Sequence, residues 1–144
     1  MEDMEKRFRE IISSRSDPGT FYGLLGMRLE ELEEGRALFT LPVEERFFNA
    51  GGVVHGGVFA SMADAAVAAA LATMVDPEGE SIATVEMKIN YMAPARGGSL
   101  VAEGRIIQRG RTVAVGECAV RDDNGRMLAK AMATFLVRAR ADVG

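Results

Sequence analysis

The chain has 144 residues, 48% of them hydrophobic, which fits one globular domain of ordinary size with a buried core. Its formal net charge is −4 at pH 7 and its basic residues are scattered, which argues against nucleic acid as a partner. One cysteine excludes an intramolecular disulfide, and one histidine leaves no cluster of soft ligands, so we expect no bound metal.

The N-terminal segment, residues 1–19, is predicted to form a helix and a linker. Charged side chains alternate with apolar ones over residues 3–14, which is typical of a short amphipathic helix. The turn-forming run Asp17-Pro18-Gly19 ends this helix. The main domain is then expected to occupy residues 20–140, with the helix docked at its edge.

A hairpin, a loop and a long apolar helix are expected next. Two strands are predicted within residues 21–41, and Pro42 ends them. The glycine-rich loop over residues 44–56 suits close approach of the backbone. The run from residue 58 to 75 has no broad polar face, so this helix must be surrounded on most sides. Its polar side chains are Ser61, Asp64 and Thr73.

Asp64 is the informative exception in this helix. An ionised carboxylate in an apolar place is costly unless it is paired or hydrated, so the acid is either anchored by a partner or placed there for chemistry. The same acid, the high alanine content and the absence of aromatic or basic flanks argue against a membrane span. The charged N-terminus lacks an apolar signal core, and together with the single cysteine this favours the cytoplasm.

The remaining sequence alternates as half-buried strands do. Further strands are expected at residues 100–108, 112–121 and 127–138. A single helix that is apolar almost all round needs the concave face of a curved antiparallel sheet around it, so the sequence predicts an α+β hot-dog fold. Over residues 82–91, one face is expected to hold Ala83, Val85, Met87, Ile89 and Tyr91, and the other Thr84, Glu86, Lys88 and Asn90.

Four features together resemble the hot-dog acyl-CoA thioesterases related to phenylacetyl-CoA thioesterase. They are Asn49, the run His55-Gly56-Gly57, Asp64 in the following helix, and the strand that begins near Thr84 and ends in Tyr-Met-Ala-Pro. The resemblance spans most of the chain. It implies acyl-CoA as the substrate, with no cofactor apart from the coenzyme A of that substrate. It also implies homodimers that share a continuous sheet and pair into homotetramers, with each active site between two subunits.

The resemblance also assigns the reacting groups. The backbone N–H of Gly56 would hold the thioester oxygen at the helix start, where the helix dipole is positive. Asp64 of the neighbouring subunit would act as general base or as nucleophile. Asn49 and Thr84 would position the attacking water or the thioester. His55 would order the loop and the helix start rather than serve as the base.

Substrate-binding residues follow from the same resemblance. An acidic protein needs local positive charge to hold the phosphates of coenzyme A, and three arginines lie where relatives contact the nucleotide. Aromatic and apolar side chains near the loop are expected to line the acyl end, although some of them must be core. The expected substrate-binding residues are Gly57, Arg96, Arg109, Gly110, Arg111, Phe48 and Met92.

These assignments have plainer alternatives. The glycines could only shape the turn, Asn49 could only accept a left-handed backbone, and Thr84 could face solvent beside Glu86. Asp64 could be salt-bridged across a subunit interface. For the whole chain we expect hydrolysis of an aryl- or medium-chain acyl-CoA. The alternatives are a non-catalytic acyl-CoA sensor and a hot-dog dehydratase or hydratase.

Overall fold

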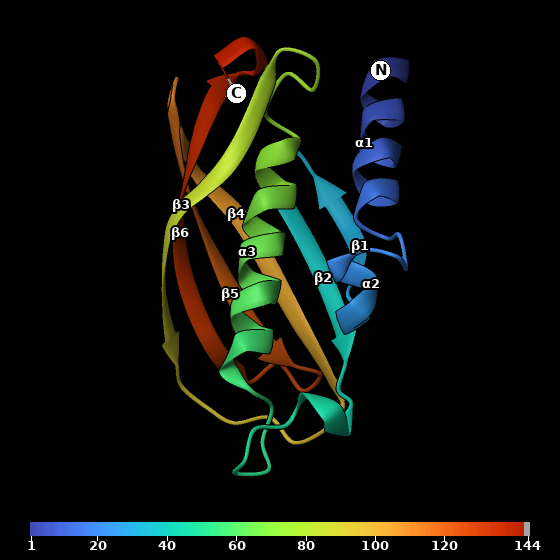
Figure 1. The fold of residues 1–144 in the computed structure, drawn as a ribbon, viewed down its shortest axis with the longest axis vertical. Helices are drawn as coiled ribbons and strands as arrows, with labels where there is room; N and C mark the ends of the chain where they lie inside the picture. Colours follow the sequence, from blue (N-terminus) through green and yellow to red (C-terminus); the bar gives the residue numbers. More distant parts are fainter. Residues whose placement is uncertain (143–144) are drawn as a thin grey trace.

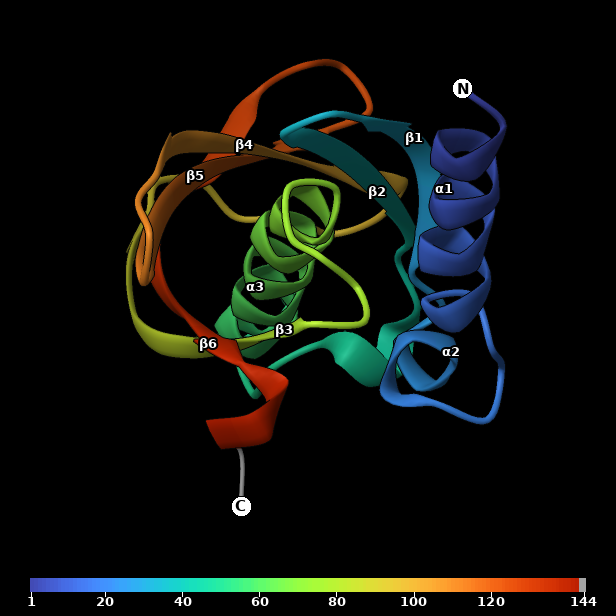
Figure 2. The same ribbon diagram turned by 90° about the horizontal axis from the view of Figure 1, so that it is seen from above.

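One long helix, α3 (Gly56–Ala72), lies in the concave face of a six-stranded antiparallel sheet (Figures 1 and 2). The computed structural model describes residues 1–142. The strand order is β1-β2-β4-β5-β6-β3, so β1 and β3 form the two edges. This is the α+β hot-dog fold that the sequence predicts. The strands are β1 (Arg28–Glu33), β2 (Arg36–Pro42), β3 (Glu80–Tyr91), β4 (Ser99–Arg109), β5 (Val113–Asp122) and β6 (Met127–Ala139).

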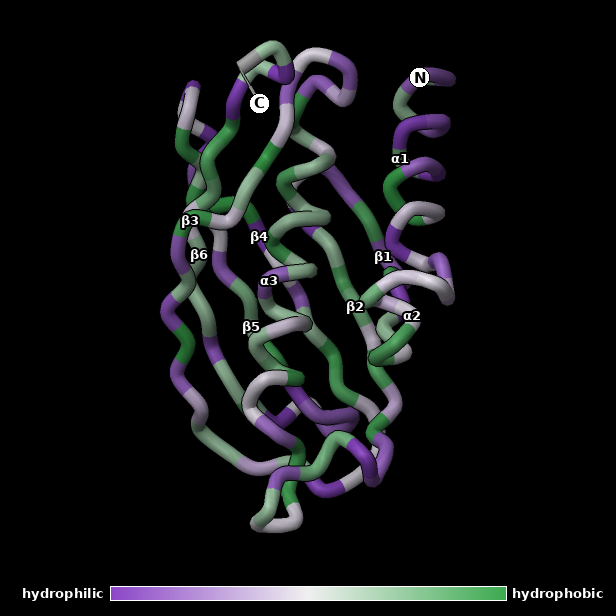
Figure 3. Tube along the Cα trace, viewed as in Figure 1, coloured by the Kyte–Doolittle hydropathy of each residue, from purple (hydrophilic) through white to green (hydrophobic). Residues whose placement is uncertain are grey.

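Small side chains let α3 lie unusually close to the sheet. The helix is rich in alanine, and most of it is apolar in Figure 3. A Cβ atom added to Gly104 on β4 would lie 2.5 Å from the carbonyl carbon of Ala66, so only glycine fits beneath the helix there. One face of α3 stays open: Asp64, Ala68 and Ala72, spaced four residues apart, are all half-buried. The helix is therefore wrapped on every side but one.

Two short helices cover the β1 edge. α1 (Glu2–Ser14) runs beside β1 and buries Ile11 in the core. α2 (Phe21–Leu25) occupies the beginning of the region where a strand is predicted, and that part of the prediction is wrong. The turn closes because Gly26 takes a left-handed conformation, with φ 78°, as the C-cap. Single-turn 3-10 helices at Glu45–Phe47 and Arg140–Asp142 complete the elements.

β3 does not alternate as strictly as predicted. Its pairing with β6 shifts register between Thr84 and Glu86, so a β-bulge interrupts the strand. Before the bulge Thr84 faces the helix, and after it Met87 packs against the core while Glu86 bonds to Thr134 on the outer face. The prediction that Thr84 shares a face with Glu86 is therefore wrong, because the extra residue at the bulge reverses the pattern.

Candidate active site

The start of α3 is shaped by a histidine cap. His55 is the N-cap residue, and its Nδ1 atom accepts a hydrogen bond from the Gly57 N–H at 2.8 Å. The Val58 N–H donates to the His55 carbonyl oxygen at 2.9 Å. Within residues 1–142 the Gly56 N–H has no hydrogen-bond partner. Of the two glycine N–H groups considered from the sequence, Gly56 alone is therefore free to hold an oxyanion.

A cleft opens beside this free N–H group. The ring of Tyr91 lies so close that a Cβ atom on Gly56 would be 3.0 Å from its Cε1 atom, so any larger residue there has to push the ring aside. Tyr91 also stacks on Phe59, with ring centroids 6.3 Å apart. The cleft has a volume of about 380 Å³ and is lined by Asn49, Val53, Val54, Gly56, Phe59, Tyr91, Met92, Ala93 and Pro94.

Asp64 lies two turns further along the open face of α3. Its Oδ1 atom accepts a hydrogen bond from the Thr84 hydroxyl at 2.7 Å. The bulge in β3 turns Thr84 toward the helix and makes this bond possible. No basic side chain within the described residues forms an ion pair with Asp64. The second Asp64 oxygen therefore stays available to a water or a substrate.

The loop before α3 places Asn49 and Phe48 on different sides of the helix start. Asn49 accepts a hydrogen bond from the Gly51 N–H at 2.8 Å through its side-chain oxygen, so this oxygen shapes the loop. The amide nitrogen of Asn49 remains for a ligand in the cleft, which Met92 also lines. Phe48 lines a separate hollow with Phe21 and His55.

The arginines predicted to bind phosphate are divided between the two ends of α3. Arg96 follows β3 near the helix start, whereas Arg109 bonds the Met74 carbonyl oxygen just beyond the helix end. Arg109 also forms an ion pair with Glu80 at 3.0 Å. The Asp76 N–H, and then the Arg109 guanidinium, lower the pKa of Glu80. Arg111 and Gly110 lie in the turn after Arg109, where the Gly110 N–H donates to the Val113 carbonyl oxygen.

Comparison with known proteins gives the family. The profile of the thioesterase superfamily matches residues 51–129. The chain belongs to the thioesterase superfamily. A Saccharolobus solfataricus protein assigned as an esterase is 32% identical over 95% of this chain and 94% of its own. Human acyl-coenzyme A thioesterase 13 is 30% identical over 79% of this chain and 81% of its own. A Pseudomonas aeruginosa thioesterase variant superposes with a TM-score of 0.84 at 25% identity, over 92% of this chain and 94% of its own.

As a member of this superfamily, the protein is a thioester hydrolase, and its groups have the chemistry that thioester hydrolysis needs. A free N–H at a helix N-terminus can stabilise the oxyanion, and a carboxylate can activate water. Gly56 and Asp64 are eight residues apart, however, and a rise of 1.5 Å per residue separates them by about 12 Å along the axis. Within one chain they cannot both contact the same acyl carbon.

Tyr91 is absent from the site predicted from the sequence, whereas Phe59 is among the apolar residues expected to line the acyl end, and the cleft contains it. The apolar position of Tyr91 in a strand is that of an ordinary core residue, so the sequence offers no sign of its role in a cleft. Among residues 1–142, no three His, Cys, Asp or Glu side chains gather as a metal site requires. None of the helices in this part of the chain is long and apolar enough to cross a membrane.

Proposed function

We propose that the protein hydrolyses acyl-CoA thioesters at sites formed between two copies of the chain. The main observation in its support is the separation of about 12 Å between Gly56 and Asp64 on one helix. An oxyanion donor and a general base must act on the same carbonyl group, so Gly56 of one protomer needs the partner's Asp64.

The free edge of the sheet supports such a dimer. β3 is twelve residues long, and its outer edge has no neighbouring strand among the described residues. Antiparallel pairing of two β3 edges around a two-fold axis would continue the sheet and set the two α3 helices antiparallel. If the helices cross near Ala60, Gly56 of one lies level with the partner's Asp64. The small side chain of Ala60 on the open face allows this close approach. Two such dimers would then associate into a homotetramer.

In the proposed reaction, the Gly56 N–H and the positive end of the α3 dipole polarise the thioester carbonyl. The partner's Asp64 takes a proton from water, and the water oxygen attacks the acyl carbon. Collapse of the tetrahedral intermediate expels the coenzyme A thiolate, which then takes up a proton. Asn49 contributes its amide N–H to the thioester or water, and Thr84 holds the Asp64 carboxylate. Direct attack by Asp64, through an acyl anhydride that water then hydrolyses, is the alternative route.

The cleft beside Gly56 suits the part of an aryl- or medium-chain acyl group that adjoins the thioester. The stacked Phe59 and Tyr91 rings offer a flat apolar surface, and Met92 adds an adaptable wall. Arg96, near the helix start, would hold a phosphate of the coenzyme A, whereas Arg109 and Arg111 lie beyond the other end of α3.

Release of thiol from a panel of aryl- and alkyl-CoA esters tests this function, with wild type compared with Asp64→Ala and Asp64→Asn. We expect a loss of at least about 100-fold in turnover, the low end of what removing a general base costs. Equal turnover in wild type and both variants would refute the role of Asp64. Tight binding of acyl-CoA without any thiol release would indicate a sensor, and would refute hydrolysis.

A further inference from the structure

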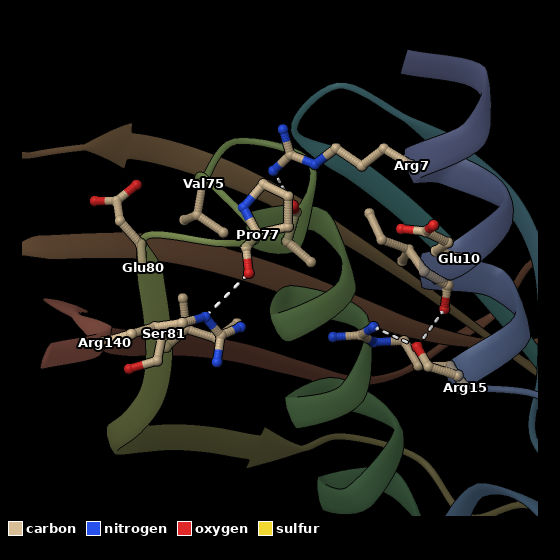
Figure 4. A pocket seen from close by; sticks show the side chains of 12 residues that line it. Arg7, Glu10, Arg15, Val75, Pro77, Glu80, Ser81 and Arg140 are labelled. Carbon is tan, nitrogen blue, oxygen red and sulfur yellow. Dashed lines mark hydrogen bonds between the residues drawn. The ribbon is translucent and has the colours of Figure 1, made fainter. Parts of the chain in front are cut away.

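A second cavity, of about 490 Å³, lies between α1, the end of α3 and the beginning of β3 (Figure 4). Its wall is partly apolar, with Ile11, Val75 and Ile82. Its polar lining includes three arginines, Arg7 of α1, Arg15 at the C-cap of α1 and Arg140 from the C-terminal turn, together with Glu10 and Glu80. In Figure 4, Arg15 and Arg140 extend toward each other in front of α3. The cavity is therefore apolar on one side and cationic on the other.

The three guanidinium groups have no carboxylate partner within residues 1–142. Arg7 donates to the Ala72 carbonyl oxygen, Arg15 to the Ser14 hydroxyl and Arg140 to the Pro77 carbonyl oxygen. The Nε atoms of Arg7 and Arg15 are buried with no hydrogen-bond acceptor at all. A buried donor without an acceptor is destabilising, so these two N–H groups are open to an acceptor supplied by a ligand.

The two acidic residues of the cavity do not pair with its three arginines. Glu80 accepts both the Arg109 guanidinium, at 3.0 Å, and the Asp76 N–H. Glu10 is exposed and lies 4.0 Å from Lys6 on the same helix. Neither acid forms an ion pair with Arg7, Arg15 or Arg140 among the described residues, so these guanidinium groups remain open to an anionic ligand.

The open face of α3 connects this cavity to the proposed reacting carboxylate. Asp64, Ala68 and Ala72 form one stripe at four-residue spacing, and Ala72 lines the cavity. Eight residues place the cavity about 12 Å from Asp64 along the helix. The alanine side chains leave a shallow apolar path between the two.

We infer that this cavity receives the far end of the acyl group, and that this end carries a carboxylate. The inference rests on the proposed function, because it takes Asp64 as the residue at the thioester. A guanidinium group can donate two parallel hydrogen bonds to a carboxylate of opposite charge. The apolar wall suits the methylene chain that leads to this carboxylate. The diphosphate and ribose phosphate of coenzyme A have no such apolar surface, which favours an ω-carboxyacyl group over the nucleotide. The substrate class is therefore an acyl-CoA derived from a dicarboxylic acid.

Matched substrates test this inference. Values of kcat/KM are measured for adipoyl-, suberoyl- and sebacoyl-CoA and for hexanoyl-, octanoyl- and decanoyl-CoA, which differ only in the terminal carboxylate. We expect wild type to favour the carboxylated ester at one chain length by about tenfold or more, as for a charged hydrogen bond. Arg15→Gln, Arg140→Gln and the double variant should abolish this preference and leave the plain esters unchanged. Arg9→Gln, an exposed position on the same helix, is the matched control.

Other outcomes would overturn the inference. Wild type that hydrolyses plain esters with no preference for the carboxylate would refute it and leave the proposed function standing. An equal loss of kcat/KM for the carboxylated and the plain esters would show that the arginines bind the coenzyme A phosphates. A changed oligomeric state with an unchanged preference for the carboxylate would show that they contact a second copy of the chain. If no ester is hydrolysed, the proposed function fails. Calorimetric titration with suberate against octanoate then still decides the cavity: binding of suberate alone, lost in the double variant, supports it, and no binding refutes it.

Discussion

The Thr84 hydroxyl donates a hydrogen bond of 2.7 Å to the Asp64 carboxylate, and a β-bulge makes this contact possible. Regular alternation would turn Thr84 to the outer face of the sheet, beside Glu86. The shift in register between these two residues turns Thr84 inward and leaves Glu86 outside, bonded to Thr134. The irregularity in β3 therefore orients the one acid on the open face of α3.

Replacing Thr84 tests whether this contact orients the carboxylate for the reaction. Thr84→Val keeps the shape of the side chain but removes the donor, and a hydrogen bond to a charged acceptor contributes about 1.5–3 kcal/mol. We expect kcat to fall about tenfold or more with little change in KM, because substrate binding does not use the hydroxyl. Thr84→Ser, which keeps the donor, should retain most of the activity. Equal rates for the Val and Ser variants would show that the hydroxyl has no positioning role.

Thr84 also illustrates which parts of the structure can be predicted from the sequence. The long apolar helix, the four C-terminal strands and the exceptional position of Asp64 follow from hydrophobic periodicity alone. The bulge does not, because it arises from the way β3 pairs with β6 and leaves no mark in the composition of the strand. α2 is missed for a similar reason: Phe21–Leu25 is apolar enough for a strand, and it becomes a helical turn through tertiary packing, in which Tyr22 stacks on Phe39.

The cleft beside Gly56 could be predicted only in part. Glycine before a helix, with a histidine cap, indicates a ready anion site. The choice between Gly56 and Gly57 depends on which N–H the His55 ring occupies, and that depends on a side-chain rotamer. Tyr91 is brought over Gly56 by the path of β3, which no local pattern encodes. Sequence thus identifies the reacting groups, and packing determines what surrounds them.

Removing the Gly56 N–H tests the oxyanion donor. Gly56→Pro deletes this donor at the first helical position, where proline is tolerated, and the extended backbone of His55, with ψ 135°, is compatible with a following proline. We expect turnover to fall about 100- to 1,000-fold, as for loss of an oxyanion-hole donor. Gly56→Ala keeps the N–H but meets the Tyr91 ring, and it should lose less activity than the proline variant. The opposite ranking would exclude the donor role.

Mixing two inactive variants tests whether each site spans two chains. A dimer of one Gly56→Pro chain and one Asp64→Ala chain contains one site with both groups intact. Co-refolding equal amounts should therefore restore about a quarter of the wild-type turnover, because half the dimers are mixed and each has one good site. The unmixed variants, refolded alone, serve as controls. A mixture as inactive as its components would contradict a site shared between subunits.

Cys118 should not react in the folded protein. Its thiol is fully buried on β5, and burial raises the pKa of Cys118 to about 12. The thiol therefore stays protonated near neutral pH, whereas the reactive form of cysteine is the thiolate. A chromogenic disulfide reagent should label no thiol in native buffer and one per chain in denaturing urea. Rapid labelling of the native protein would show that this region opens readily, and would also disturb the assay of coenzyme A release.

The Gly104→Ala variant tests whether the close approach of α3 to the sheet is essential to both stability and activity. In Gly104→Ala the new Cβ would lie 2.5 Å from the Ala66 carbonyl carbon, and backbone atoms cannot move aside as a side chain does. We expect the free energy of unfolding to fall by about 1–3 kcal/mol, the usual cost of overpacking, as measured by urea denaturation. Gly97→Ala is the control, because nothing lies within 4 Å of its added Cβ. Asp64 is two residues before Ala66, so a helix lifted from the sheet would also weaken the Asp64–Thr84 contact and lower kcat. Equal stability of the Gly104→Ala and Gly97→Ala variants would mean that the helix can shift without cost.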